Sequence, residues 1–355
     1  MSKPANLSSS ADLKQRWVNL HTQNPQLHAR DAARQLKASE AQLIATGCGK
    51  TAVRLTGDWA GLIKYLPLLG RVMALTRNEH ALHEQQGTYG DVNVSGNICL
   101  FRGGEIDLRV SLAHWHYGFA VRETTLSGTR HSLQFFDRDG SAVHKIYLTD
   151  ESDLLAYEAL TASYRGHNQS TTQDVKAAPP ASPLKPDREI DVESLRADWD
   201  KLREPHEFFA MLHRFGVTCL QALRLVGNAR AWRVATTSLR LVLESASDIR
   251  LPIRIKVDNP GALQIYTGLI HNPRSVGQWY SVLDTDFNLH VREAAIESAW
   301  VVRRPTLKGA ISGAVTSLEL FDQSGNSVAC LLGRPKPGIP EDLAWRSLLN
   351  ALPSL

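Results

Sequence analysis

Two short segments, one in each half of the chain, alternate strictly between apolar and polar residues. Residues 105–112 and residues 287–291 both have this period of two, which predicts strands with one buried face and one polar face. The segments 11–45 and 191–226 are typical of helices, and a shorter helical stretch closes each half. Each half is therefore expected to begin with helices, continue with strands and end with a helix.

Turn signals connect the expected strands as hairpins. The pattern Phe-Asp-x-x-Gly occurs at 136–140 and again at 321–325, and turns of this kind join neighbouring antiparallel strands. A block of strands between helices, without strict alternation of the two, indicates an α+β fold with antiparallel sheets.

The same pieces recur in the same order in both halves, which indicates a tandem duplication. The matching pieces are Leu13–Trp17 with Leu195–Trp199, Ile106–Arg109 with Phe287–His290, Ser132–Gly140 with Ser317–Gly325, and Leu155–Tyr157 with Leu343–Trp345. The distance between matching pieces is too long for a solenoid repeat. We expect each half to be a large antiparallel β-sheet flanked by helices.

A segment rich in Pro, Ala, Ser and Thr separates the two halves. Residues 166–190 contain almost no large apolar side chain, which is typical of a linker. The expected organisation is an N-terminal repeat at 1–165, the linker at 166–190 and a C-terminal repeat at 191–355.

Composition excludes several classes of protein. Apolar residues make up 43% and charged residues 21% of the 355 residues, which indicates a globular chain. The 40 Lys and Arg residues against 36 Asp and Glu residues leave a net charge of +4, too small and too dispersed to predict a nucleic-acid partner. The most apolar segment, 62–75, is interrupted by charged residues, Pro and Gly, so no membrane span is expected.

The expected compartment is the cytoplasm. The first residues contain no apolar stretch of the kind that directs export. Cys48, Cys99, Cys219 and Cys330 are far apart and have no zinc-binding spacing, so we expect free thiols in a reducing compartment.

Common catalytic motifs are missing from the sequence. Gly47–Thr51 resembles the end of a phosphate-binding loop, but Ile44 stands where that motif needs its first glycine. We expect a turn between helices there. Neither Gly-x-Ser-x-Gly nor His-Glu-x-x-His occurs.

The stretch 203–215 contains the most informative candidate residue, His206. Pro205 suits the first turn of a helix, so His206 is expected near the helix N-terminus, on one face with Phe209, Ala210 and His213. The positive end of a helix disfavours the imidazolium, and a neutral imidazole beside flat apolar groups suits haem iron. The spacing leaves a second interpretation open, a capping or surface histidine.

Three further residues are candidates for contact with haem, and for each the alternative is an ordinary surface position. Arg109 lies on the polar side of its expected strand, and Arg304 follows Arg303 before a proline. Either arginine suits a carboxylate such as a haem propionate, or lies in solvent. His83 is three residues from His80, a spacing that puts both on one helical face, or both are surface histidines.

These residues belong to strings that resemble the HemS-type, or hemin-degrading factor, family of cytoplasmic haem-binding proteins from bacterial haem-uptake systems. The strings are Arg77–Glu84, Asp107–Arg109, Ser132–Asp137, His206–Phe209, Gln221–Ala222, Gln264–Gly268, Ala299–Thr306 and Ser317–Asp322. The resemblance extends from Trp17 to Trp345 and implies two similar halves, each a large antiparallel sheet with helices against it.

The resemblance also implies roles for the candidate residues. It makes His206 the proximal ligand of haem b, places Arg109 on the distal side and Phe209 in the pocket wall, and puts Arg304 near the propionates. His83 matches a position implicated in a second haem site in some members. The implied ligand of the metal is thus His206, and haem is cargo or substrate.

The sequence departs from the family at three positions. Cys219 stands where relatives often have arginine, Cys330 lies in a changed strand, and Leu332 replaces a distal tyrosine. The cysteines are alternative soft ligands for iron. The loss of the tyrosine favours a role without chemistry at a distal hydroxyl.

Three functions remain open at this point. The first is a carrier that accepts haem from an inner-membrane importer and delivers it to a haem oxygenase for iron release. The second is an enzyme that opens the macrocycle and releases iron, with Arg109 stabilising developing charge. The third is a structural or regulatory two-domain protein whose histidines bind no metal. We favour the carrier.

Overall fold

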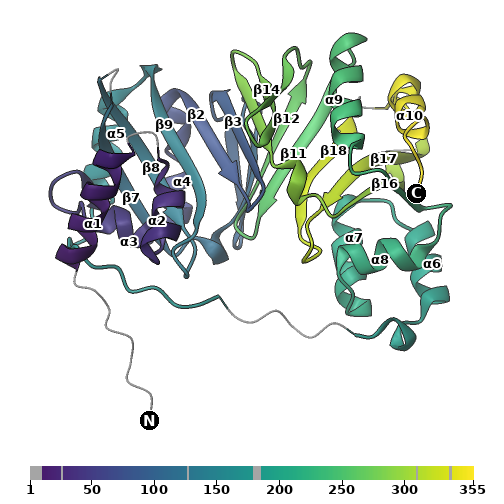
Figure 1. The fold of residues 1–355 in the computed structure, drawn as a ribbon, viewed down its shortest axis with the longest axis horizontal. Coiled ribbons are helices and arrows are strands. Elements are labelled where there is room, and N and C mark those ends of the chain that lie inside the picture. The colour runs from purple at the N-terminus through teal and green to yellow at the C-terminus, as the bar shows by residue number, and fades with distance from the viewer. Residues whose placement is uncertain (1–9, 25–26, 126–127, 179–184, 309–310, 336–337) are drawn as a thin grey trace. The chain divides into compact units, whose positions relative to one another are not determined.

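The chain folds into two compact units, each built from strands and helices (Figure 1). The computed structural model describes residues 10–24, 27–125, 128–178, 185–308, 311–335 and 338–355. The first unit comprises Met1–Thr76, Gln85–Pro179 and Asn259–Leu263, and the second comprises Arg77–Glu84, Pro180–Asp258 and Gln264–Leu355. Each unit thus includes one short segment from the opposite half of the sequence. Residues 179–184 of the expected linker lie outside the described residues.

Helices begin and end each unit, as the sequence predicts. The segment 11–45 forms α1 (Ser10–Gln23), α2 (Ala29–Leu36) and α3 (Glu40–Ala45), and the segment 191–226 forms α6 (Val192–Asp200), α7 (Pro205–Phe215) and α8 (Cys219–Val226). The closing helices are α5 (Leu154–Ser163) and α10 (Leu343–Asn350). Two others are α4 (Trp59–Ile63) and α9 (Ser238–Asp248).

The strands form two large antiparallel sheets of nine strands each. The strands of the first unit are β1 (Ala52–Arg54), β2 (Gly70–Arg77), β4 (Asp91–Ser95), β5 (Ile98–Arg102), β6 (Asp107–Ser111), β7 (Tyr117–Thr125), β8 (Gly128–Phe136) and β9 (Ala142–Ser152). Strands β1, β2 and β7–β9 belong to one sheet, and β4–β6 belong to the other. The strands of the second unit are β10 (Ala231–Val234), β11 (Ile253–Asn259), β13 (Pro273–Val276), β14 (Trp279–Leu283), β15 (Phe287–Val291), β16 (Ser298–Lys308), β17 (Ile311–Phe321) and β18 (Ser327–Gly333). The unit boundaries fall inside β3 (Ala81–Gly87) and β12 (Ala262–Gly268).

Both units follow one strand plan, which confirms the duplication. The order β1-β7-β8-β9-β2 of the first unit matches the order β10-β16-β17-β18-β11 of the second. A three-stranded meander, β4-β5-β6 or β13-β14-β15, is the other shared part. The α+β class with antiparallel sheets and flanking helices is therefore confirmed.

The two Phe-Asp-x-x-Gly sequences form the expected hairpin turns. Gly140 donates its N–H to the carbonyl of Asp137 at 2.8 Å, and Gly325 donates to that of Asp322 at 3.0 Å. Both glycines have a left-handed backbone, with φ of 79° and 78°, a conformation that strains other residues. The two hairpins β8–β9 and β17–β18 thus turn in the same way.

Alternation along the strands determines which side chains enter the cores. In β6, Leu108 and Val110 are buried and Arg109 is exposed, and in β15 Phe287, Leu289 and Val291 are all buried. Figure 1 shows α5 beside strands β8 and β9 in the first unit, and α9 and α10 beside strands β11, β17 and β18 in the second. These helices cover faces that would otherwise expose apolar side chains.

Two local expectations are wrong. The turn at 47–51 connects helix α3 to strand β1 rather than two helices, because the chain enters the sheet directly at Ala52. His83 does not share a helical face with His80, since it lies in strand β3 and is fully buried.

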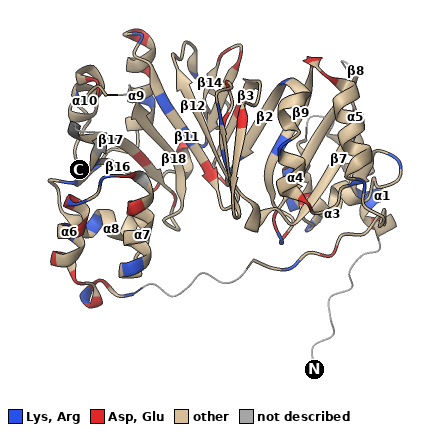
Figure 2. Ribbon diagram, turned by 180° about the vertical axis from the view of Figure 1, so that it is seen from behind, with Lys and Arg blue, Asp and Glu red and all other residues tan. Residues whose placement is uncertain are grey.

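The charge distribution, the helices and the cysteines of the described chain bear on three further expectations. Figure 2 shows acidic and basic positions interspersed over the helices and strands of each unit. Within the described ranges, no helix combines the length and the apolar character that a membrane crossing requires. All four cysteines are free thiols, as expected.

Candidate functional site

Helix α7 forms because the residues around its start satisfy the free backbone N–H groups. The Glu207 carboxylate accepts hydrogen bonds from the backbone N–H groups of Arg203 at 2.6 Å and Glu204 at 3.0 Å, which closes a capping box. Pro205 occupies the first helical turn, and Gly216 ends the helix with a φ of 66°. These bonds also hold the pKa of Glu207 below its usual value. The carboxylate therefore stays charged at the helix N-terminus.

The two faces of α7 differ sharply. Phe208, Met211 and Leu212 are buried, whereas His206, Phe209, Ala210 and His213 are exposed. The Phe209 side chain is 69% exposed, unusual for so large an apolar group. In the described part of the chain, the His206 ring has no hydrogen-bond partner. The predicted face therefore exists, and it presents an imidazole beside an exposed aromatic ring.

The buried face of α7 rests on an aromatic and cationic cluster. Phe208 packs edge-on against Trp199 of α6, with ring centroids 5.5 Å apart. The Arg304 guanidinium lies 4.0 Å from the centroid of Phe208 and 5.4 Å from that of Trp199. Trp199 donates its indole N–H to the carbonyl of Arg303 at 3.1 Å. The cluster thus joins α6, α7 and strand β16.

Arg304 is itself held by a carboxylate. Both of its terminal nitrogens contact Glu319 on β17, Nη2 at 3.1 Å from Oε2, and Ser317 donates to Oε1 of the same carboxylate at 2.7 Å. Burial raises the pKa of Glu319, but the Arg304 guanidinium, the Ser317 hydroxyl and the Lys256 charge together lower it, so that the pKa lies below its usual value. The side chains of the pair are only 20% and 10% exposed. Glu319 therefore stays ionised and neutralises Arg304.

The two cysteines that depart from the family pattern border this ion pair. Cys219 begins α8, and its Sγ lies 3.8 Å from Oε2 of Glu319. Cys330 is the direct cross-strand partner of Glu319. Burial and the nearby carboxylate raise the pKa of both thiols, that of Cys330 to about 12. Both cysteines are therefore neutral thiols at physiological pH.

Arg109 lies on β6 in the first unit. Its side chain is exposed between the buried Leu108 and Val110, and its strand partner is Leu100. Within the described ranges, its guanidinium has neither an ion pair nor a hydrogen bond. Arg109 is therefore able to meet an anionic or polar ligand without breaking an existing pair.

His83 lies in the core of the second unit. Its side chain is fully buried, and its ring packs against Phe287 with centroids 5.1 Å apart. A haem could reach this imidazole only if the strand moved. The role of His83 at a second haem site stays a prediction.

The residues that support α7 have no distinctive motif in the sequence. Glu319 and Phe208 occur in the quoted strings, but only as parts of a repeat or a motif. The available signal is that Ser317 and Glu319, alternate residues of an apolar strand, place polar groups on one face. That pattern indicates a buried polar partner, but it does not identify Arg304.

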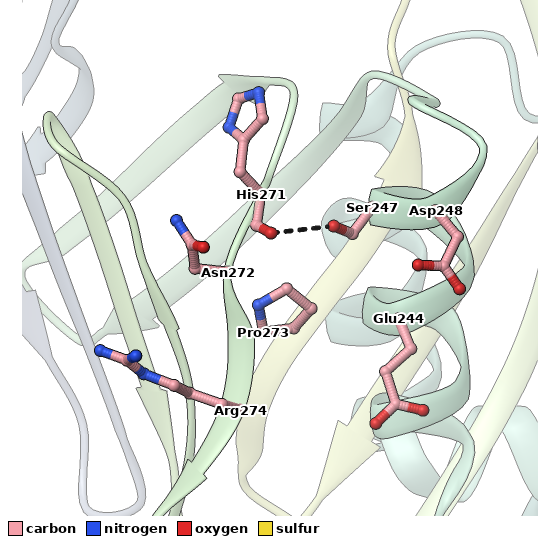
Figure 3. Close-up of a pocket in the computed structure, with 7 residues that line it drawn as sticks. All are labelled: Glu244, Ser247, Asp248, His271, Asn272, Pro273 and Arg274. Atoms are coloured by element: carbon pink, nitrogen blue, oxygen red, sulfur yellow. Dashed lines mark hydrogen bonds between the residues drawn. The ribbon is translucent and has the colours of Figure 1, made fainter.

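A shallow pocket of about 370 Å³ lies elsewhere on the second unit, between α9 and the start of β13 (Figure 3). It is lined by Glu244, Ser247, Asp248, His271, Asn272, Pro273 and Arg274. Figure 3 shows Ser247 donating to the carbonyl of His271, a bond of 3.2 Å. Its lining is polar and open, unlike a site for a flat apolar ligand. It includes none of the predicted site residues.

A family model for the haemin-degrading HemS/ChuX domain matches the chain twice, at residues 37–164 and 216–352. The chain belongs to the HemS family. The two matches cover one repeat each and agree with the duplicated strand plan. The HemS model contains the positions of Arg109 and Arg304, whereas its second match begins at Gly216, directly after helix α7.

Full-length relatives support membership in the HemS family. The hemin transport protein HemS of Yersinia enterocolitica is 36% identical over 346 residues, covering 97% of this chain and 98% of that protein. The structure of holo-PhuS, a heme-binding protein from Pseudomonas aeruginosa, matches with a TM-score of 0.93 at 40% identity, over 98% of this chain and 100% of the other. That of ChuS, an E. coli heme oxygenase, matches with a TM-score of 0.85 at 32% identity, over 96% and 99%.

Proposed function

We propose that this protein binds haem through His206 and carries it in the cytoplasm for iron release. The observation that carries the proposal is the exposed imidazole of His206 beside the 69% exposed ring of Phe209 on α7. An unpaired imidazole supplies an axial ligand for haem iron, and an exposed aromatic ring supplies a flat apolar wall. The hemin transport protein of Yersinia and the heme-binding protein of Pseudomonas make haem the expected ligand.

The remaining site residues take distinct roles in this proposal. Arg109 acts on the side of the haem opposite His206, where its unpaired guanidinium directs a water or a polar ligand. Arg304 is the predicted partner of a propionate, but a propionate would have to compete with Glu319 for its guanidinium. His206 is the only one of these residues that binds the metal.

Leu332 favours carrier function over haem degradation. This residue stands where relatives often have a distal tyrosine, and a leucine supplies no hydroxyl for proton transfer. The proposed partners are an inner-membrane haem importer that donates haem and a haem oxygenase that accepts it. Degradation of haem by the protein itself is the second candidate, because ChuS of E. coli is a heme oxygenase with a similar fold over the full length.

A haem titration tests the ligand. We expect a shifted Soret band for the wild type, loss of most of that shift in His206→Ala, and a modest change in Arg109→Ala. His213→Ala is the matched control, because His213 is an exposed histidine on the same face of α7. An unchanged spectrum for His206→Ala would refute the assignment and make His213 the next candidate.

A second experiment separates the carrier from the enzyme. The haem complex is mixed with an electron donor in the presence of catalase, which removes free peroxide that attacks haem without an enzyme. The carrier proposal predicts that the haem spectrum persists until apo haem oxygenase is added. Formation of a biliverdin-like product and free iron at catalytic rates without that acceptor would refute it.

A further inference from the structure

The buried ion pair beneath α7 has no counterpart at the matching positions of the first repeat. Ser132 corresponds to Ser317, and their cross-strand partners are Val121 and Val302, so that Glu123 corresponds to Arg304. Glu123 forms a surface pair with Arg130 at 2.8 Å, with 34% of its side chain exposed. The first repeat has a buried pair as well, but at other positions: Lys145 of β9 pairs with Glu40 of α3. A buried pair of an arginine with the position two residues after the shared serine thus occurs in the repeat that contains α7.

The stability of the fold does not by itself explain a buried ion pair. Removing two charges from water is costly, and a buried ion pair is often no more stabilising than apolar residues of the same volume. The pair does, however, orient the guanidinium. Glu319 and Ser317 bind its terminal nitrogens, and its central carbon Cζ lies over the ring of Phe208, 4.0 Å from the centroid.

Phe208 links this support to the candidate ligand. It lies two residues after His206 in the same helical turn, and its ring is 5% exposed. Phe208 is therefore the contact through which the ion pair reaches the first turn of α7 and its imidazole. Of the described side chains at positions 206–209, Phe208 is the buried one, Glu207 is partly buried, and His206 and Phe209 are exposed.

We propose that Arg304 is a positioning residue, which Glu319 holds against Phe208 so that α7 presents His206 to haem iron at a fixed angle. This inference rests on the proposed function, because it assumes that His206 is the ligand. It differs from the predicted propionate contact, in which Arg304 would touch the haem itself.

The test uses Arg304→Gln/Glu319→Gln, which removes both charges and leaves neither one buried and unpaired. Phe208→Leu is a second variant that keeps the ion pair and removes the aromatic face. Arg240→Gln/Glu293→Gln is the matched control, because Arg240 also pairs with a glutamate, at 2.7 Å, and lies 4.7 Å from the centroid of an aromatic ring, that of Tyr280. Circular dichroism and thermal unfolding establish that each variant is folded.

Three porphyrins distinguish the two roles of Arg304. We expect both α7-support variants to bind haem about tenfold more weakly, equivalent to about 1.4 kcal/mol, with the same loss for haem dimethyl ester, whose propionates are masked. Metal-free protoporphyrin IX should bind the variants and the wild type equally. A loss seen with haem and absent with the dimethyl ester would overturn the proposal in favour of a propionate contact.

A double-mutant cycle and a spectrum complete the test. Added to His206→Ala, the two support variants should cause no further loss of haem affinity, because there is no imidazole left to position. The iron–imidazole stretching band of the ferrous complex should shift in the support variants and not in the control. An undiminished loss in the His206→Ala background, or normal haem binding by folded support variants, would overturn the proposal. Normal binding by His206→Ala alone would instead refute the proposed function.

Discussion

His144 should make the stability of the protein fall steeply below neutral pH. Its imidazole is fully buried in the first unit, where Nδ1 lies 2.9 Å from the hydroxyl of Thr76 and Nε2 lies 2.8 Å from that of Tyr89. A neutral imidazole has one donor and one acceptor, which matches two hydroxyl partners. A second proton would place a charge in the core, and burial accordingly lowers the pKa of His144 from 6.5 to about 3.

The magnitude follows from proton uptake by the unfolded chain. Between pH 6.5 and pH 3 the unfolded chain binds a proton at this residue and the folded chain does not, so stability is complete above pH 6.5 and declines as the pH falls. Between pH 7.5 and pH 5.0 the decline due to His144 amounts to about 2 kcal/mol.

Urea unfolding at the two pH values measures this contribution. The free energy of unfolding of the wild type should fall by about 2 kcal/mol more than that of His144→Gln, whatever packing the substitution itself loses. His167→Gln, which changes an exposed histidine, should follow the wild type. Parallel pH profiles for the wild type and His144→Gln would mean that the buried ring does not remain neutral.

Three other substitutions test separate parts of the structure. Glu40→Ala should lower the free energy of unfolding by about 3–5 kcal/mol, because it leaves the buried Lys145 ammonium without its carboxylate at 2.7 Å, whereas Glu40→Met/Lys145→Met should restore most of it; urea unfolding checks both. Gly118→Ala should cost about 1–3 kcal/mol by thermal unfolding, since the new Cβ would lie 2.6 Å from the ring of Trp59, and an unchanged melting temperature would contradict that packing. Arg109→Ala should leave the melting temperature unchanged and alter the Soret band of the haem complex, because the side chain is exposed and unpaired in the described chain; a large loss of stability would contradict its solvent-exposed position.

The local sequence pattern predicts part of the candidate site. Pro205 and the spacing from His206 to Phe209 predict a helix with an imidazole beside an aromatic ring near its start, because helix starts and helical periodicity depend on residues within one or two turns. The resemblance to HemS-type proteins added the expected ligand, which spacing alone left open. Neither source indicated what lies beneath the helix.

The sequence by itself determined that each half begins with helices, continues with strands and ends with a helix, and it determined the hairpin turns, since these depend on residues close together in the chain. It also revealed the duplication, because the same short strings recur in both halves. Only the tertiary structure decided that His83 is buried and that Glu319 pairs with Arg304. It also decided that 77–84 and 259–263 belong to the unit of the opposite half. Alternation reveals that a strand has an apolar face, but the residues that cover this face come from distant segments. Burial, ion pairing and the freedom of an imidazole to bind a ligand are therefore properties of the folded chain.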